Sequence, residues 1–360
     1  MLFFSSIQAQ INLPRPSTNL RCMSGRQVAL TDIEVRWGAP GVKGREGKIW
    51  GTDIANYGFM VLGFGSDSES PWRAGADECT TMSFSTDVAI NGKSLAAGKY
   101  AFFIALYPDS SILIFSKNVE EWGSYFYRPE MDVLRVTTRQ QKNQPQSIER
   151  LQYVFSDQTD STVTVALEWE RWRIPFTVGI DVKQTTISYL RSKLSSGLGF
   201  DPPSLQTAAQ WCLTNNVNTD EALRWINVAM DPTLGGVQSF SALSTKAGLL
   251  LKKNNTSEAD KMMEKALDNA TVLEMHGYGR QLINQKKYKE ALVVFEKNFT
   301  KHGDTWPVHV GLARGYSGVG DLKKALEHAK KAQNQAPDEI NKRSLDGMIK
   351  TLSEGKALAQ

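Results

Sequence analysis

The C-terminal part of this chain repeats itself with a period of about 34 residues, and this feature limits its fold more than any other. A unit this short cannot bury its apolar face alone, so several units must stack and share a core. The spacing therefore predicts a stacked array of helical pairs. The positions that align at this spacing are Ala291 with Ala325, Tyr288 with Leu322, Phe295 with Ala329, and Gly303-Asp304 with Pro337-Asp338.

In the two clear repeats, 271–304 and 305–338, small, aromatic and helix-stop residues fall where helix pairs need them. This pattern resembles the tetratricopeptide repeat, in which Ala and Gly let helices approach closely and Tyr or Phe fills the gap between pairs. Two weaker copies precede these repeats, with spacing that slips near Gly235-Gly236. We expect about four helical pairs over residues 204–340 and a capping helix over residues 341–360. The alternative is an unrelated helical bundle.

Stacked helix pairs form a concave groove lined by the first helix of each repeat, the usual surface for a partner. Arg280 and Arg314 occupy equivalent positions of the two clear repeats, and Trp211 is the equivalent residue of the first copy. We therefore expect a protein or peptide partner in a groove that contains these three residues. The arginine pair predicts a preference for an acidic segment or a C-terminal carboxylate, and solvated arginines are the alternative.

The N-terminal half has the pattern of β-strands. Residues 162–170 alternate with period two, which places Val163, Val165, Leu167 and Trp169 on one face. Turn signals recur about every ten residues and no βαβ rhythm is present, so we expect a β-sandwich or jelly-roll-like domain. We assign this all-β domain to residues 10–183 and a helix with a linker to residues 184–203.

Four motifs of this half occur in the order found in a known family. They resemble a secreted bacterial domain of unknown function, number twenty-nine eleven, over roughly residues 10–180. The resemblance implies the β fold and export, and it implies no activity, because the family has none established. The motifs are Pro40-Gly41-Val42-Lys43-Gly44-Arg45, the segment from Trp72 to Thr80, Ile90-Asn91-Gly92-Lys93 with Ala97-Gly98-Lys99-Tyr100, and Trp122-Gly123.

Polar and aromatic residues crowd together in these motifs and form our candidate ligand site. An indole offers a stacking face, and arginine and carboxylate side chains orient a small molecule or glycan through hydrogen bonds. The alternatives are an arginine–carboxylate network that holds a long loop and, for residues 43–45, a tight glycine turn. The candidate residues are Lys43, Arg45, Trp72, Arg73, Asp77, Glu78 and Trp122.

Histidine placement limits the chemistry of the β domain. All four histidines lie in the C-terminal half, so the β domain alone cannot form a Ser–His–Asp triad or a His-ligated metal site. We expect no cofactor and no metal. A carboxylate mechanism, such as one that uses Glu168 and Glu170 on a carbohydrate, stays open, although a solvated strand face also explains this pair.

The first nine residues, with an apolar run that ends at Ala9, are typical of the remnant of a signal peptide. A frayed hydrophobic terminus is the alternative. The net charge of +4 gives no reason to expect nucleic acid, and no apolar stretch reaches the length of a membrane span. The three cysteines allow one disulfide at most.

These observations predict a secreted or periplasmic binding or scaffold protein. Its sandwich would bind a ligand or envelope component, and its repeats would bind protein. The alternative is a carboxylate-mechanism enzyme, with a carbohydrate as the candidate substrate, in which the repeats dock a partner.

Overall fold

The structure is a computed structural model that describes residues 19–66 and 68–358. The segment 1–9, with the predicted cleavage point after Ala9, lies outside the described residues. The chain divides into two compact units, Met1–Tyr189 and Leu190–Gln360. The first unit contains β-sheets and the second contains helices, so the predicted order of an all-β and an all-α part is confirmed.

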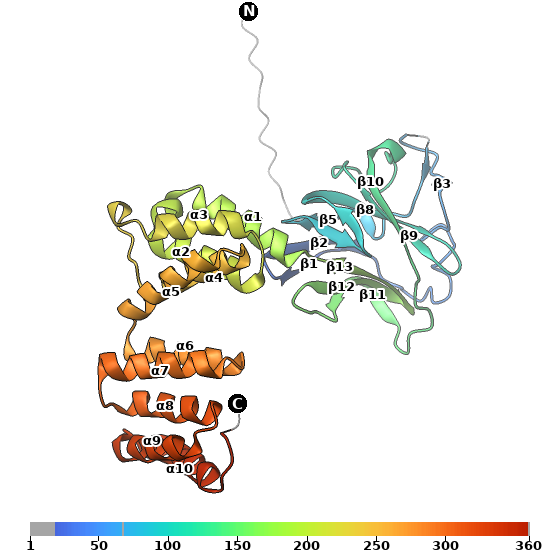
Figure 1. The fold of residues 1–360 in the computed structure, drawn as a ribbon. Coiled ribbons are helices and arrows are strands. Elements are labelled where there is room, and N and C mark those ends of the chain that lie inside the picture. The colour runs from blue at the N-terminus through green and yellow to red at the C-terminus, as the bar shows by residue number, and fades with distance from the viewer. Residues whose placement is uncertain (1–18, 67, 359–360) are drawn as a thin grey trace, which may run out of the picture. The chain divides into compact units, whose positions relative to one another are not determined.

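The first unit is a sandwich of two antiparallel sheets, and Figure 1 shows the two layers facing each other. One sheet has the order β1-β2-β5-β8-β9-β10, the other has the order β11-β12-β13-β6-β7, and β3 pairs with β4 separately. The strands are β1 (Leu20–Val28), β2 (Thr31–Ala39), β3 (Met60–Val61), β4 (Glu69–Ser70), β5 (Ala76–Phe84), β6 (Val88–Ile90), β7 (Lys93–Leu95), β8 (Gly98–Leu106), β9 (Ser111–Ser116), β10 (Asp132–Thr138), β11 (Ile148–Ser156), β12 (Thr162–Glu170) and β13 (Trp172–Gly179).

The core of the sandwich lies between the sheets. In β12 the predicted inward residues, from Val163 to Trp169, are all buried, because the alternation of the strand points them at the other sheet. Aromatic rings join the two layers: the ring centroids of Phe102 and Phe176 lie 5.8 Å apart, and those of Trp37 and Tyr153 lie 5.0 Å apart. Strand β8 is buried on both faces, since its outer side is covered by a smaller cluster around Phe103 and Tyr127.

Ten α-helices follow in the described part of the chain. Helix α1 begins at Val182, two residues before the predicted start, because the Asp181 carboxylate accepts a hydrogen bond from the Gln184 amide. Similarly, α10 begins at Glu339 because Asp338 accepts a hydrogen bond from the Asn341 amide. The helices are α1 (Val182–Leu194), α2 (Pro202–Asn215), α3 (Thr219–Ala229), α4 (Phe240–Lys252), α5 (Thr256–Asn269), α6 (Val272–Asn284), α7 (Tyr288–His302), α8 (Trp306–Gly318), α9 (Leu322–Gln335) and α10 (Glu339–Ser353).

Consecutive helices from α2 to α9 pack as pairs: α2 with α3, α4 with α5, α6 with α7, and α8 with α9. First helices of neighbouring repeats also touch, as α2 does with α4 and α6 with α8. This is the packing of stacked tetratricopeptide-type repeats, and Figure 1 shows α6 to α10 following one another in chain order. The predicted repeat fold is therefore confirmed.

Glycines on two helices make room for one aromatic ring in this array. Phe295 of α7 is fully buried, and its ring lies against Gly279 of α6 and against Gly311 and Gly315 of α8. A Cβ atom at Gly279 would lie 2.3 Å from the Phe295 Cε1 atom. The small residues of the repeat pattern thus let this ring fill the space between helix pairs.

Two glycines of α6 give a matched test of this packing. Gly279→Ala should lower the free energy of unfolding of the helical unit by about 1–3 kcal/mol, because the new methyl group collides with the Phe295 ring. Gly277→Ala should raise it by up to about 1 kcal/mol, because no atom lies within 4 Å and alanine favours the helix. Urea unfolding followed by far-ultraviolet circular dichroism measures both changes. Equal stability of the two variants would contradict the packing argument.

Candidate functional site

A pocket of about 370 Å³ in the sandwich brings together five of the seven candidate ligand residues. It lies where the β2–β5 ladder shifts register, between Arg36 and Gly38. The shift is a β-bulge or irregularity, which releases the neighbouring segments from regular pairing. The lining residues are Asn19, Pro40, Lys43, Arg45, Ile54, Trp72, Arg73, Gly75, Ala76, Asp77 and Trp169.

The first wall of the pocket is the loop of residues 40–45. The main chain of Glu149 accepts a hydrogen bond from the Val42 amide (2.7 Å), and its side chain accepts one from the Lys43 amide (3.1 Å). Arg45 then donates to the carbonyl oxygens of Val42 and Gly41, at 2.9 and 2.6 Å. The alternative of a tight turn is therefore seen, yet the turn also holds Lys43 and Arg45 at the pocket.

Trp72 forms the back of the pocket and belongs to the core. Its main chain exchanges hydrogen bonds with Ile104 of β8, and the residue is only 4% exposed. Its ring packs edge-on against Trp50 and parallel to Trp169, at centroid distances of 5.7 and 6.3 Å. Trp72 does not present the exposed ring face that the predicted stacking platform requires.

Arg73 is held by the main chain around it. Its Nη1 atom donates to the carbonyl oxygen of Asp77 at 2.8 Å, and its guanidinium lies over the Tyr125 ring, 5.0 Å from the centroid. Gly123 has φ of +65°, and a Cβ atom there would lie 2.2 Å from the Arg73 Cζ atom. A side chain at position 123 would therefore be strained in its backbone and would displace the Arg73 guanidinium. On the opposite rim, the Asn19 amide donates to the Asp77 carboxylate at 3.1 Å.

Glu78 and Trp122 are the two candidates that the structure places elsewhere. Asp77 and Glu78 are consecutive residues of β5, but Asp77 has a left-handed φ of 63°, so the regular alternation of a strand does not assign their faces. Glu78 forms an ion pair with Arg21 of β1 and does not line the pocket. Trp122 is 51% exposed and also lies outside the lining. The sequence could not show which face each side chain takes at a bulge.

The carboxylates considered for an enzyme mechanism are engaged by other parts of the sandwich. Glu168 pairs with Arg173 and accepts a hydrogen bond from Gln152 at 2.9 Å. Glu170 accepts hydrogen bonds from the Gly47 amide and the Trp50 indole, both at 2.8 Å. Asp77 is the one acidic residue in the lining of the pocket. A pair of carboxylates facing a substrate is therefore not assembled among the residues of this pocket.

Sequence reasoning missed Asn19, Ile54 and Trp169 as pocket residues. Trp169 was predicted correctly as an inward residue of β12, but nothing in its alternation indicates a pocket at the end of that strand. Its indole Nε1–H is buried without a hydrogen-bond partner among the described residues. Burying a hydrogen-bond donor without an acceptor costs about 1–3 kcal/mol of folding free energy, which singles out this indole N–H among the groups of the site.

Arg280 and Arg314, the predicted pair of the helical unit, come together on the first helices α6 and α8. Arg314 is partly buried, and burial together with the Arg280 charge lowers the pKa of its guanidinium. The Arg314 Nε–H is buried without a partner in the described part of the chain. Trp211 of α2 does not join this pair, since it packs against the hydrophobic cluster of α2 to α4.

His276 lies beside the two arginines and forms a cluster with them. Its Nδ1 atom lies 2.9 Å from the Pro307 carbonyl oxygen, which can only accept, so Nδ1 carries the proton. Burial, together with the charges of Arg280 and Arg314, lowers the pKa of His276 to about 4. His276 is therefore neutral at pH 7, and the positive charge of the cluster belongs to the two arginines.

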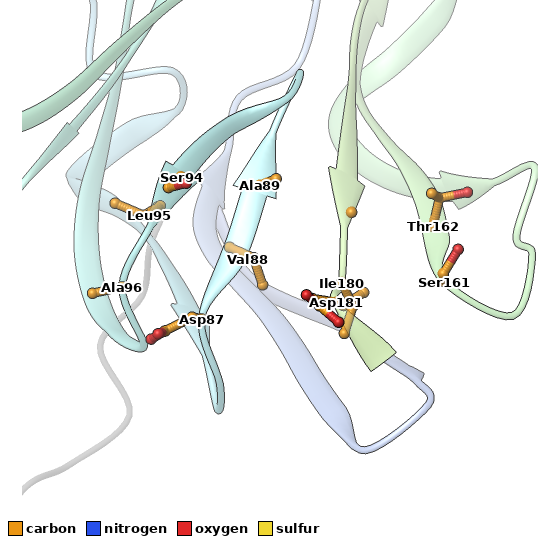
Figure 2. Close-up of a pocket in the computed structure, with 11 residues that line it drawn as sticks. Asp87, Val88, Ala89, Ser94, Leu95, Ala96, Ser161, Thr162, Ile180 and Asp181 are labelled. Carbon is orange, nitrogen blue, oxygen red and sulfur yellow. The ribbon is translucent and has the colours of Figure 1, made fainter. Parts of the chain in front are cut away.

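A second hollow of the sandwich, of about 640 Å³, lies at one end of the five-stranded sheet, between β6 and β7 and the ends of β12 and β13 (Figure 2). Its two carboxylates hold the main chain: Asp87 accepts from the Ala97 amide at 2.8 Å, and Asp181 accepts from the Gln184 amide at 3.0 Å. None of the sequence candidates lies in this hollow. Its lining is otherwise small, hydroxylated or apolar, so it lacks the cations that distinguish the first pocket.

Three further findings bear on the expected chemistry. Within residues 19–66 and 68–358, no group of three His, Cys, Asp or Glu side chains could hold a metal ion. No helix of the described chain is long and apolar enough to cross a bilayer. Cys22, Cys79 and Cys212 are free thiols, so the one disulfide that the sequence allowed is not formed.

Fold and sites define a β-sandwich joined to a tetratricopeptide-like helical array. Residues 20–178 match the family model described as "Protein of unknown function (DUF2911)". This match confirms the resemblance that the four sequence motifs indicated, and it adds no activity. A comparison with curated proteins gave no match.

Solved structures resemble part of the chain at low similarity. MamA from Desulfovibrio magneticus RS-1, from residue 41 to its end, is 23% identical over 43% of this chain and 90% of its own, with a TM-score of 0.28. YrrB, described as a TPR protein with an unusual peptide-binding site, is 17% identical over 46% of this chain and 84% of its own, also at 0.28. The assignment of the helical unit as tetratricopeptide-like therefore rests on the pairing of its helices and on the repeat spacing of the sequence.

Glu121 beside the exposed Trp122 gives a pH-dependent test of the sandwich. The Glu121 carboxylate is buried, and this burial raises its pKa to about 7, although the Asn118 side chain and the Arg128 charge favour the ionised form. The folded state then keeps a proton that the unfolded state releases near pH 4.5, so the stability of the sandwich falls as pH rises from about 5 to 8. Glu121→Gln should remove this fall and stabilise the sandwich at pH 8 by up to about 3 kcal/mol.

Glu120→Gln is the matched control, because Glu120 is the exposed neighbour. Urea unfolding of the sandwich, followed by tryptophan fluorescence from pH 5 to 8, measures the profiles. Parallel profiles for the wild type and both variants would contradict the assignment.

Proposed function

We propose that the protein is a scaffold that binds an acidic segment of a partner protein in the groove of its helical repeats. In this proposal, Arg280 and Arg314 contact a carboxylate of the partner. The sandwich is the second binding module, for a ligand or an envelope component. The observation that carries the proposal is the half-buried Arg314. It lies beside Arg280, and its own Nε–H donor has no partner among the described residues.

The electrostatics of the helical unit support a carboxylate as the missing partner. Two nearby guanidinium groups repel each other, and taking one of them partly out of water is costly without an anion. Some other cations of the array have acidic partners on another helix, such as Arg191 with Glu221 and Lys297 with Asp268. A carboxylate placed between Arg280 and Arg314 would satisfy the free donor and relieve the repulsion.

The position of the pair supports a groove ligand. Arg280 and Arg314 lie at equivalent places on α6 and α8, which are first helices of neighbouring repeats and pack against each other. First helices line the concave surface of stacked helical repeats, where extended segments of partners bind. His276 is neutral at neutral pH and donates to Pro307, so it fixes the α6–α8 contact beside the two charges.

Peptide binding by the full chain tests this function. The probe is an array of random dodecapeptides, each synthesised with a free and with an amidated C-terminus, and the best binders are then titrated by fluorescence anisotropy. Binders should be acidic or require the free carboxylate. Arg314→Gln and Arg280→Gln should each weaken binding about 10-fold or more, because a charge-assisted hydrogen bond contributes about 1.5–3 kcal/mol.

Arg224→Gln is the control, since Arg224 is an exposed arginine of α3, a second helix of a repeat. An array without binders would overturn the function. Binders that keep their affinity in both groove variants would overturn the arginine pair as its carboxylate site.

We also propose that the protein is secreted or periplasmic, on the basis of the apolar run that ends at Ala9. Fractionation of the source cells and N-terminal sequencing of the recovered protein test this location. Export predicts a mature chain that starts at Gln10 in the secreted or periplasmic fraction. Recovery of the chain with Met1 from the cytosol would contradict it.

A further inference from the structure

We propose that the pocket around Lys43, Arg45 and Arg73 binds a small hydroxylated acid, whose carboxylate or other oxyanion lies between the three cations. This inference rests on the proposed role of the sandwich as a ligand-binding module and does not involve the groove of the repeats. The three cations come from two segments far apart in sequence, the loop after β2 and the segment before β5, and they line one pocket.

The three cations lack acidic partners in the described part of the chain. Arg45 and Arg73 donate to main-chain carbonyl oxygens, which fix the direction of each guanidinium without neutralising it. Each guanidinium carries five N–H donors in a planar fork, so donors remain for a ligand oxyanion. The ion pairs among the described residues of the sandwich lie elsewhere, at Arg21–Glu78, Arg36–Glu34, Arg135–Asp132, Lys142–Asp109 and Arg173–Glu168.

Three residues in or beside the pocket hold a left-handed backbone conformation. Lys43, Ala74 and Asp77 adopt positive φ values of 50°, 52° and 63°. A left-handed conformation costs a non-glycine residue about 1–2 kcal/mol, and such strain concentrates where a site must be held in shape. Two of these residues line the pocket, and Ala74 lies between the lining residues Arg73 and Gly75.

The other polar groups of the pocket indicate the rest of the ligand. Asp77 and Asn19 form a hydrogen-bonded rim that can accept from and donate to hydroxyl groups. Trp169 lines the same pocket and carries a buried indole N–H without an acceptor among the described residues. Because the volume of about 370 Å³ is near the lower end of ligand pockets, a ligand of one sugar-sized ring fits better than an oligomer.

Isothermal titration calorimetry with the full-length protein tests the inference. The probes are glucuronate, glucose 6-phosphate, and glucose as the neutral analogue. Glucuronate or the phosphate should bind, and glucose should bind at least about 10-fold more weakly, because it lacks the oxyanion. The tighter of the two anions identifies whether the oxyanion is a carboxylate or a phosphate.

Variants separate this pocket from other cations of the protein. Arg73→Met keeps much of the packing against Tyr125 and should weaken anion binding about 10-fold or more. Lys43→Met should weaken it about 3-fold or more, whereas Lys48→Met, an exposed lysine of the same loop that does not line the pocket, should leave it unchanged. The Arg280→Gln/Arg314→Gln double variant should also bind the anion normally, which separates this site from the peptide groove.

The inference would be overturned by the absence of any heat of binding with either anion, by equal affinity for glucose, or by anion affinity that survives both Arg73→Met and Lys43→Met. Loss of anion binding in the Arg280→Gln/Arg314→Gln variant alone would assign the anion to the groove and would likewise overturn it. Unfolding profiles of each variant, measured by tryptophan fluorescence, show whether the sandwich is folded. If Arg73→Met unfolds, the comparison of Lys43→Met with Lys48→Met decides the outcome.

Discussion

Strands β2 and β5 approach so closely at Gly38 that a Cβ atom there would lie 2.1 Å from the Ala76 carbonyl oxygen. No other residue type fits at this position without a shift of the main chain. The ladder changes register at the same place, and the segments on either side leave the regular sheet. The loop with Lys43 and the segment with Arg73 therefore meet at the end of the sandwich. This close contact between two backbones fixes the start of both walls, which Glu149 and Ile104 then hold by main-chain hydrogen bonds.

The sequence predicted the inside of the sandwich better than its pocket. Alternation along β12 predicts its buried side chains, because burial on one face is what creates the period of two. At residues 120–123 the expectation that apolar side chains are buried and charged ones are exposed is wrong, because Glu121 is buried and Trp122 is exposed. This segment contacts β5, where the Cys79 amide donates to the Glu121 carbonyl oxygen, and it has no regular secondary structure, so no period links its residues to a face. The composition of the sequence identifies the polar segments, but it does not predict which of their side chains point into the protein and which point to solvent.

The helical unit shows why repeats make site prediction easier. Equivalent positions of neighbouring repeats are neighbours in space, so a spacing of about 34 residues was enough to bring Arg280 and Arg314 together. The rule does not extend to Trp211, which lies on α2, two repeats before Arg280, and the connection between α3 and α4 contains a short 3-10 helix, Pro232–Leu234. The repeat period predicts equivalent positions for residues only where the connections between repeats keep the same length.

The ring of Phe295 has a consequence for how the helical unit loses its structure. The ring fills space offered by Gly279 of one repeat and by Gly311 and Gly315 of the next, so neither repeat has a complete core of its own. Opening either repeat would expose the same aromatic surface to water. We therefore expect helices α6 to α9 to exchange their amide hydrogens as one cooperative unit, with similar protection on both sides of the boundary at residues 304 and 305.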